Sequence, residues 1–235
     1  MNAPRAWVLL PSGKRLNLLA PDPGSWTDLD LAIGLSRTYR WAGYSAWPRP
    51  LSVAQHSLTV LALRRRSADR RLTAAEQRRE LLHDATEALL GGFDPITPLK
   101  PHLGDGYRTL AALHQAAVDA RYDLPAWDEV SYRAHKQADH QAAASEALHC
   151  VGWSREAIRE DLEITTQPLE EDPLFPMKRF APWEPWPANY AADCFLRTLI
   201  LLTPETPPDV STPNPEPVRP AQRSLLDRRR CLRTE

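Results

Sequence analysis

The chain has 235 residues, 43% of them hydrophobic, and a formal net charge of -1, which suits one core of about 200 residues and does not force nucleic-acid binding. Its three cysteines, Cys150, Cys194 and Cys231, are widely spaced, which argues against a disulfide framework and against a Cys-x-x-Cys zinc site. No apolar run approaches the length of a membrane span, and residues 1–10 lack the pattern of a secretion signal, so we expect a cytoplasmic protein that needs no membrane.

The chain begins with a pattern typical of a short β-hairpin. Residues 6–10 and 15–19 predict two short strands about a Ser-Gly-Lys turn. Ser25 or Thr27 can then cap a helix that runs to about Arg40, in which apolar residues recur at helical spacing.

Two further helices follow. Ser52 and Gln55 form a capping-box pattern, so the second helix begins there and His56 lies in its first turns. The third helix is predicted from about residue 73 to residue 90, where a Gly-Gly pair ends it.

The remaining pattern is helical up to a proline-rich tail. We predict helices near residues 105–121, 126–150, 154–166 and 188–202. Seven helices and almost no strand make an all-α domain over residues 1–202.

The last segment, residues 203–235, has a different composition. Seven of the eighteen residues from Thr203 to Pro220 are proline, and such a segment buries too little apolar surface to offset its ordering entropy, which predicts a disordered, flexible tail. Its arginine-rich end, residues 223–231, is either a solvated terminus or a basic patch for nucleic acid, an acidic partner or a neighbouring subunit.

The His83-Asp84 pair, with His56 upstream and Asp139 downstream, indicates a metal site. On one helix His83, Asp84 and Glu87 share a side, and other helices can add ligands. Two imidazoles and two carboxylates suit Mn, Fe, Co, Ni or Zn better than Mg or Ca. For the dipeptide alone, the alternative is an ordinary solvated turn of helix.

The residues around this pair resemble the HD-domain phosphohydrolases, and specifically the small bacterial branch similar to 5'-deoxynucleotidases. The resemblance runs over about residues 7–202. The matching blocks are residues 13–19 (GKRLNLL), 52–57 (SVAQHS), 82–88 (LHDATEA), 97–100 (TPLK), 136–139 (KQAD) and 182–196. The blocks at 52–57 and 82–88 are the ones specific to the family.

The resemblance implies an HD-domain helical bundle with one divalent transition metal (Mn, Co, Fe, Ni or Zn). It assigns His56, His83, Asp84 and Asp139 as ligands, and Glu87 as the residue that holds or deprotonates the attacking water. His135 and His140 flank Asp139; as an alternative they could ligate, and His135 could be a partner of a ligand instead.

The resemblance also implies substrate contacts. Arg40 and Trp41 match a pair that holds phosphate and sugar, unless Arg40 merely closes a helix and Trp41 packs in the core. Lys100 is a second phosphate candidate. Asp94 replaces a catalytic-site aspartate in residues 91–98, a segment that is two residues longer than in relatives. The added residues could reshape the sugar pocket, so substrate preference is the property that the resemblance predicts least well.

Three functions remain open. The first is an enzyme that removes the 5'-phosphate of a (deoxy)nucleoside monophosphate, and the second is a dNTP triphosphohydrolase that releases tripolyphosphate and needs a longer basic channel. The third is a non-catalytic nucleotide-sensing or interaction protein, against which the intact ligand set speaks. The resemblance also allows a homodimer, since relatives are often dimers, and it requires no nucleic acid.

Overall fold

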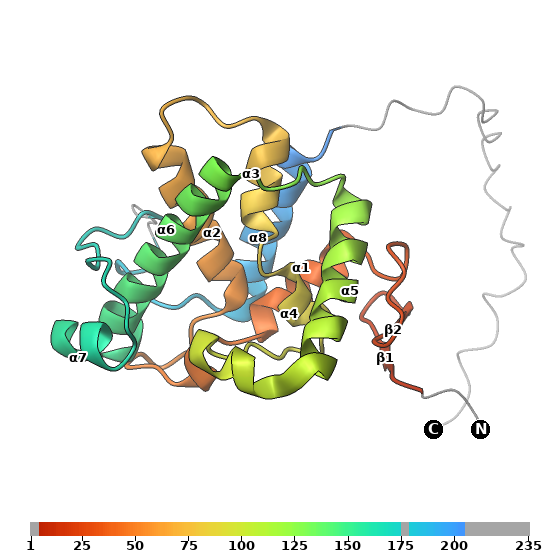
Figure 1. Cartoon of the computed structure of the whole chain (residues 1–235), viewed down its shortest axis with the longest axis horizontal. Helices are drawn as coiled ribbons and strands as arrows, with labels where there is room; N and C mark the ends of the chain where they lie inside the picture. The colour runs from red at the N-terminus through yellow and green to blue at the C-terminus, as the bar shows by residue number, and fades with distance from the viewer. Residues whose placement is uncertain (1–4, 175–178, 205–235) are drawn as a thin grey trace, which may run out of the picture. The chain divides into compact units, whose positions relative to one another are not determined.

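The computed structural model of the protein describes residues 5–174 and 179–204, and this part is mostly helical (Figure 1). The predicted tail falls almost wholly outside the described residues. In chain order, with η for 3-10 or π-helical turns, the elements are β1 (Trp7–Leu9), β2 (Arg15–Asn17), α1 (Asp28–Arg37), η1 (Trp41–Gly43), α2 (Val53–Ser67), α3 (Ala74–Leu81), α4 (Ala85–Leu89), η2 (Thr97–Leu103), α5 (Gly104–Tyr122), α6 (Glu129–Glu146), η3 (Ala147–Val151), α7 (Arg155–Glu160) and α8 (Ala188–Leu202).

The predicted hairpin is confirmed, with strands shorter than expected. β1 and β2 pair antiparallel, with Val8 opposite Leu16. The turn between them closes at Gly13, whose φ of 82° lies in the left-handed region that glycine adopts at no steric cost. Leu16 is fully buried, so the hairpin covers one edge of the helical core.

The first helix begins as predicted and ends early. Thr27, rather than Ser25, caps α1 in a capping box with the aspartate three residues on. The predicted end at Arg40 is wrong, because the backbone becomes extended at Thr38, whose carbonyl accepts a hydrogen bond from the N–H of Val53. This pairing fixes the chain entering α2 beside the end of α1.

The second helix begins where the sequence predicts it. The Ser52 hydroxyl accepts from the backbone N–H of Gln55. The second half of the expected capping box is wrong, because the Gln55 side chain turns away from Ser52 and bonds the carbonyl of Glu184 and the N–H of Trp186. α2 is thereby tied to the segment that precedes α8, and His56 follows in its first turn, fully buried.

The predicted single helix over residues 73–90 is wrong. α3 ends at Leu81, and Leu82, His83 and Asp84 form a turn before α4 begins. The His83 Nδ1–H donates to the carbonyl of Glu80 at 2.8 Å, an acceptor that a continuous helix would use for the N–H of Asp84. The break gives eight α-helices within the described residues instead of the predicted seven.

The later helices occur where predicted, with corrected ends. α5 and α8 match the expected ranges, whereas α6 passes into the π-helical turn η3 instead of continuing as one helix. The prediction of a helix over residues 154–166 is too long, because Glu163 adopts a left-handed backbone with φ 54° beyond the end of α7. No helix in the described ranges is long and apolar enough to cross a membrane.

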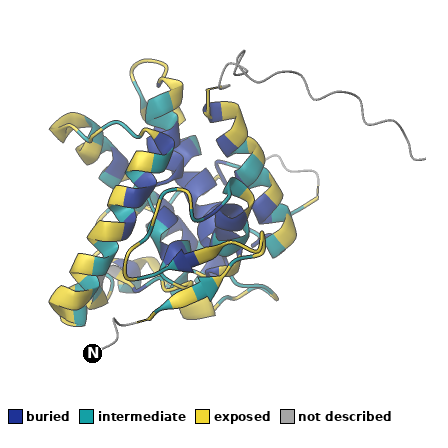
Figure 2. Cartoon of the chain, turned by 90° about the vertical axis from the view of Figure 1, so that its right-hand side faces the viewer, coloured by how far each residue is buried: buried dark blue, intermediate teal, exposed yellow. Residues whose placement is uncertain are grey.

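The core lies where α1, α2, α3 and α8 meet, and Figure 2 shows buried residues gathered inside and exposed ones on the outer faces. α1 packs against both α8 and α4. Its contact with α4 requires a glycine, since a Cβ at Gly34 would lie 2.9 Å from the Cβ of Ala88. Trp183 and Trp186, in the segment that precedes α8, are both buried. The close packing of α1 on α4 fixes the position of α4, and with it one wall of the candidate site.

Candidate metal centre

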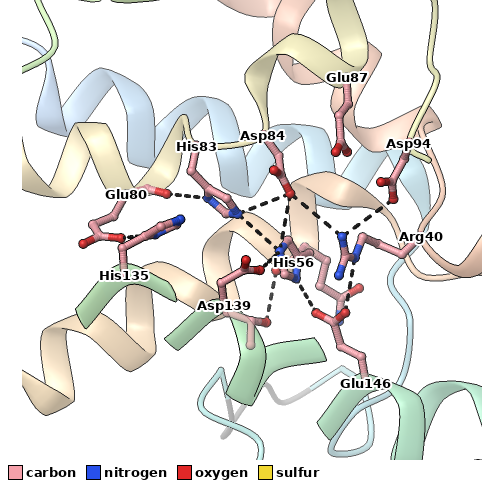
Figure 3. Close-up of polar contacts among 12 residues, drawn as sticks. Arg40, His56, Glu80, His83, Asp84, Glu87, Asp94, His135, Asp139 and Glu146 are labelled. Atoms are coloured by element: carbon pink, nitrogen blue, oxygen red, sulfur yellow. Dashed lines mark hydrogen bonds and ion pairs between the residues drawn. The ribbon is translucent and has the colours of Figure 1, made fainter. Parts of the chain in front are cut away.

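The structure brings the four predicted ligands together from three separate segments (Figure 3). His56 comes from α2, His83 and Asp84 from the turn between α3 and α4, and Asp139 from α6. Ligand atoms of the first three all lie within 4.8 Å of one another. Asp139 joins them through its Oδ1, which lies 3.4 Å from the His56 Nε2.

Hydrogen bonds fix the orientation of both imidazoles. The His56 Nδ1 lies 2.6 Å from the Glu146 Oε1, and the His83 Nδ1 lies 2.8 Å from the Glu80 carbonyl. Because both partners are acceptors, each ring carries its hydrogen on Nδ1, which in the neutral form leaves Nε2 as a free lone pair. Hydrogen bonds of this kind hold metal-ligating histidines in proteins.

The two free nitrogens face each other and the carboxylates. The Nε2 atoms of His56 and His83 are 3.3 Å apart, and the Asp84 Oδ2 lies 3.2 Å from His83 Nε2 and 3.5 Å from His56 Nε2. Electron-pair donors this close repel one another unless a cation lies between them. The arrangement therefore calls for a positive charge at its centre.

The electrostatics of the site agree with that requirement. Burial and Arg40 disfavour a charge on His56, yet Glu146 and Asp139 outweigh them and raise the pKa of His56 to about 9. Against the effect of burial, His83 and His56 lower the pKa of Asp84. A proton on His56 supplies part of the required charge. A divalent ion would meet the whole donor set, and two imidazoles with two carboxylates fit Mn, Fe, Co, Ni or Zn.

Sequence reasoning missed Glu146, which orients His56. Its side chain is 2% exposed, and its second oxygen accepts from the Arg40 Nε at 3.3 Å. Glu146 lies seven residues after Asp139, two turns along α6, so both side chains project from the same face. That spacing in an otherwise alanine-rich helix is the signal that could have revealed it.

Sequence reasoning also missed Glu80, a buried carboxylate on the other side of His83. Its oxygens accept from the Arg64 Nε at 2.7 Å and pair with the His135 Nδ1 at 2.8 Å. The His135 ring meets the His83 ring edge-on, with centroids 4.9 Å apart. The structure thus places His135 as a neighbour that packs on a ligand, whereas His140 is exposed on α6.

Arg40 lies beside the ligand cluster, engaged by carboxylates. Its NH1 is 3.7 Å from the Asp94 Oδ2 and 3.9 Å from the Asp84 Oδ2, in addition to the Glu146 contact. Burial opposes its charge, but Glu146, Asp94 and Asp84 raise the pKa of Arg40, which keeps it charged. Its neighbour Trp41 packs against a cluster of α6, η3 and α7, in agreement with the packing alternative.

A cavity of about 590 Å³ opens beside the cluster, with His83, Asp84 and Glu87 on one wall and α5 on the other. The Glu87 Oε1 lies 3.7 Å from the Lys100 Nζ. Its Oε2 is buried and has no hydrogen-bond partner among the described residues. Burial, followed by the charges of Asp84 and Asp94, raises the pKa of Glu87 well above its usual value. Glu87 and Lys100 therefore both line the cavity, whereas Asp94 faces Arg40.

Fold and site together define a mostly helical protein in which buried His56 and the half-buried His83, Asp84 and Asp139 form a cluster that fits a divalent metal. The chain belongs to the same family as an uncharacterized protein of Rhodobacter capsulatus. The two are 41% identical over 155 residues, which cover 64% of this chain and 76% of that protein. No family model matches the chain.

Proposed function

We propose that the protein is a metal-dependent phosphohydrolase of the HD-domain type that removes the 5'-phosphate of a (deoxy)nucleoside monophosphate. The observation that carries the proposal is the convergence of the His56 and His83 Nε2 atoms with the Asp84 carboxylate, because His83 and Asp84 also line a cavity together with Glu87. Catalytic metals need such an opening toward substrate, which structural metals lack.

The residues of the cavity suit phosphate hydrolysis. A divalent ion would polarise the phosphate and activate water when bound. In this proposal Glu87 takes the proton of the attacking water, since one of its oxygens has no hydrogen-bond partner among the described residues and burial raises its pKa, which makes it a stronger base than an ordinary carboxylate. Lys100, whose Nζ lies 3.7 Å from the Glu87 Oε1, would balance the negative charge of a phosphate bound there.

The distribution of basic residues favours a monophosphate over a triphosphate. Lys100 and Arg108 are the basic side chains that line the cavity. Arg37 lines a separate hollow between α1 and α8, and Arg49 pairs with Glu184. A triphosphate would need more cationic contacts than these walls supply.

The test is a screen of purified protein loaded with Mn, Co, Ni, Zn or Mg against deoxynucleoside mono- and triphosphates. We expect inorganic phosphate from the monophosphates. Release of tripolyphosphate with monophosphates left intact would support the triphosphohydrolase instead, and nucleotide binding without any hydrolysis would support the sensing protein. His83→Ala should lose both bound metal and activity, whereas His140→Ala, a matched change on the exposed side of α6, should keep both.

A further inference from the structure

Helix α5 contributes a strip of side chains to the lining of the cavity. Tyr107, Ala111 and Gln115 line it at four-residue spacing and thus from one face of the helix, together with Ala112. The two alanines leave space in the middle, and Tyr107 and Gln115 mark ends that are roughly 12 Å apart along the helix axis. The turn that carries His83 and Asp84 lines the same cavity, together with Glu87, across from these α5 side chains.

Tyr107, which lines the cavity, makes an aromatic pair with Phe93, which contacts it from beyond the lining residues. Its ring and that of Phe93 have centroids 6.0 Å apart and planes at 89°. Phe93 is 44% exposed, so core packing does not account for it. It follows Gly91 and Gly92, both with left-handed backbones at φ 82° and 78°, which turn the chain from α4 toward α5.

The same short segment reaches the metal cluster. Asp94, the residue after Phe93, contacts Arg40, which in turn lies 3.9 Å from Asp84. The aromatic pair is therefore held at a fixed place relative to the ligand cluster. A flat aromatic group could occupy the end of the cavity beside Tyr107 while a phosphate on the same molecule faces Glu87 and Lys100.

We propose that Tyr107 and Phe93 form a binding site for the nucleobase, so that the protein prefers nucleoside monophosphates to phosphate esters without an aromatic group. The inference rests on the proposed function and adds the residues that select the substrate. Every base has a flat π face, so the Tyr107 ring can stack on purines and pyrimidines alike, while Phe93, at 89° to that ring, holds it in place edge-on. Removing the rings should weaken nucleotide binding about 5- to 100-fold, the range that base stacking gives.

The test is calorimetric binding of deoxyadenosine 5'-monophosphate and of 2-deoxyribose 5-phosphate. The protein is metal-loaded and carries Glu87→Gln, so that the ligands are not consumed. Tyr107→Leu and Phe93→Leu remove the rings and keep apolar bulk, and Tyr44→Ala, at an exposed tyrosine after η1, is the matched control.

We expect the nucleotide to bind at least tenfold tighter than the sugar phosphate, and both leucine variants, but not the Tyr44 variant, to lose that preference. Equal affinities, or a preference that survives in both leucine variants, would overturn the inference. In that case phosphate release by the wild-type protein from deoxyadenosine 5'-monophosphate would leave the proposed function standing, because hydrolysis is measured separately. Failure of both esters to bind would overturn the inference as well, and inactivity of the wild-type protein would overturn the function with it.

Discussion

Replacing Glu146 by glutamine tests the orientation of the metal ligands without removing any of them. Glu146 uses both oxygens, one toward the His56 Nδ1 at 2.6 Å and one toward the Arg40 Nε at 3.3 Å. Glutamine has the same shape but only one acceptor oxygen, so its NH₂ group must face a donor hydrogen of His56 or of Arg40. A charge-assisted hydrogen bond is replaced by a repulsive contact in a buried site.

The expected effects are of two kinds. Losing one charge-assisted bond should lower the free energy of unfolding by about 1.5–3 kcal/mol. Losing the partner that holds His56 should weaken metal affinity about 10- to 100-fold. Urea unfolding measures the first quantity, and competition with a chelating dye for Mn or Co measures the second.

The control is Glu129→Gln, the same chemical change at the other end of α6. Glu129 is 85% exposed, and its one partner in the described part of the chain is Arg133, also exposed, so we expect neither quantity to move measurably. Unchanged metal affinity in Glu146→Gln would refute the orienting role. An equal loss in Glu129→Gln would show that the effect comes from the helix as a whole.

Three further outcomes are expected. Glu87→Gln should keep its metal by elemental analysis but lose about 10²–10⁴-fold in kcat; near-normal turnover would remove Glu87 from the role of base. Gly34→Ala, whose Cβ would lie 2.9 Å from a side-chain carbon of α4, should cost about 1–3 kcal/mol in urea unfolding, whereas Gly106→Ala in α5 has open space and should cost nothing. Hydrogen bonds, first with Arg70, lower the pKa of Glu76 from 4.5 to about 2, so the contribution of Glu76 to stability is present above pH 4.5 and is lost as the pH falls toward 2. In Glu76→Gln the urea concentration at the unfolding midpoint should therefore depend less on pH between 4.5 and 2. An unchanged pH dependence would show that it does not come from Glu76.

The sequence predicted those elements whose signals are local. The hydroxyls of Thr27 and Ser52 accept hydrogen bonds from backbone N–H groups three residues further on, so each helix start depends on residues that are close together in the sequence. The helix break at His83 was not predictable from apolar spacing, because it depends on a side-chain bond to the Glu80 carbonyl. That break also changes how Glu87 is placed, since His83 and Glu87 no longer share one continuous helix.

The candidate site was predicted in part for a similar reason. The four proposed ligands stand in recognisable sequence blocks, and the structure brings them together. Glu146 and Glu80 act through contacts with residues far away in the chain, namely His56, Arg40, Arg64 and His135. The seven-residue spacing from Asp139 puts Glu146 on the same face of α6, but the partners of both glutamates depend on how the helices pack.

The origin of the ligands in α2, the α3–α4 turn and α6 links metal binding to folding of the helical unit. An unfolded chain cannot present these groups together, so an ion that binds the folded state stabilises it by mass action, by about 2.7 kcal/mol at one hundred times the dissociation constant. The unfolding temperature should therefore rise with the concentration of the correct ion. Thermal shift across a series of metals would thus identify the preferred ion before any substrate is known.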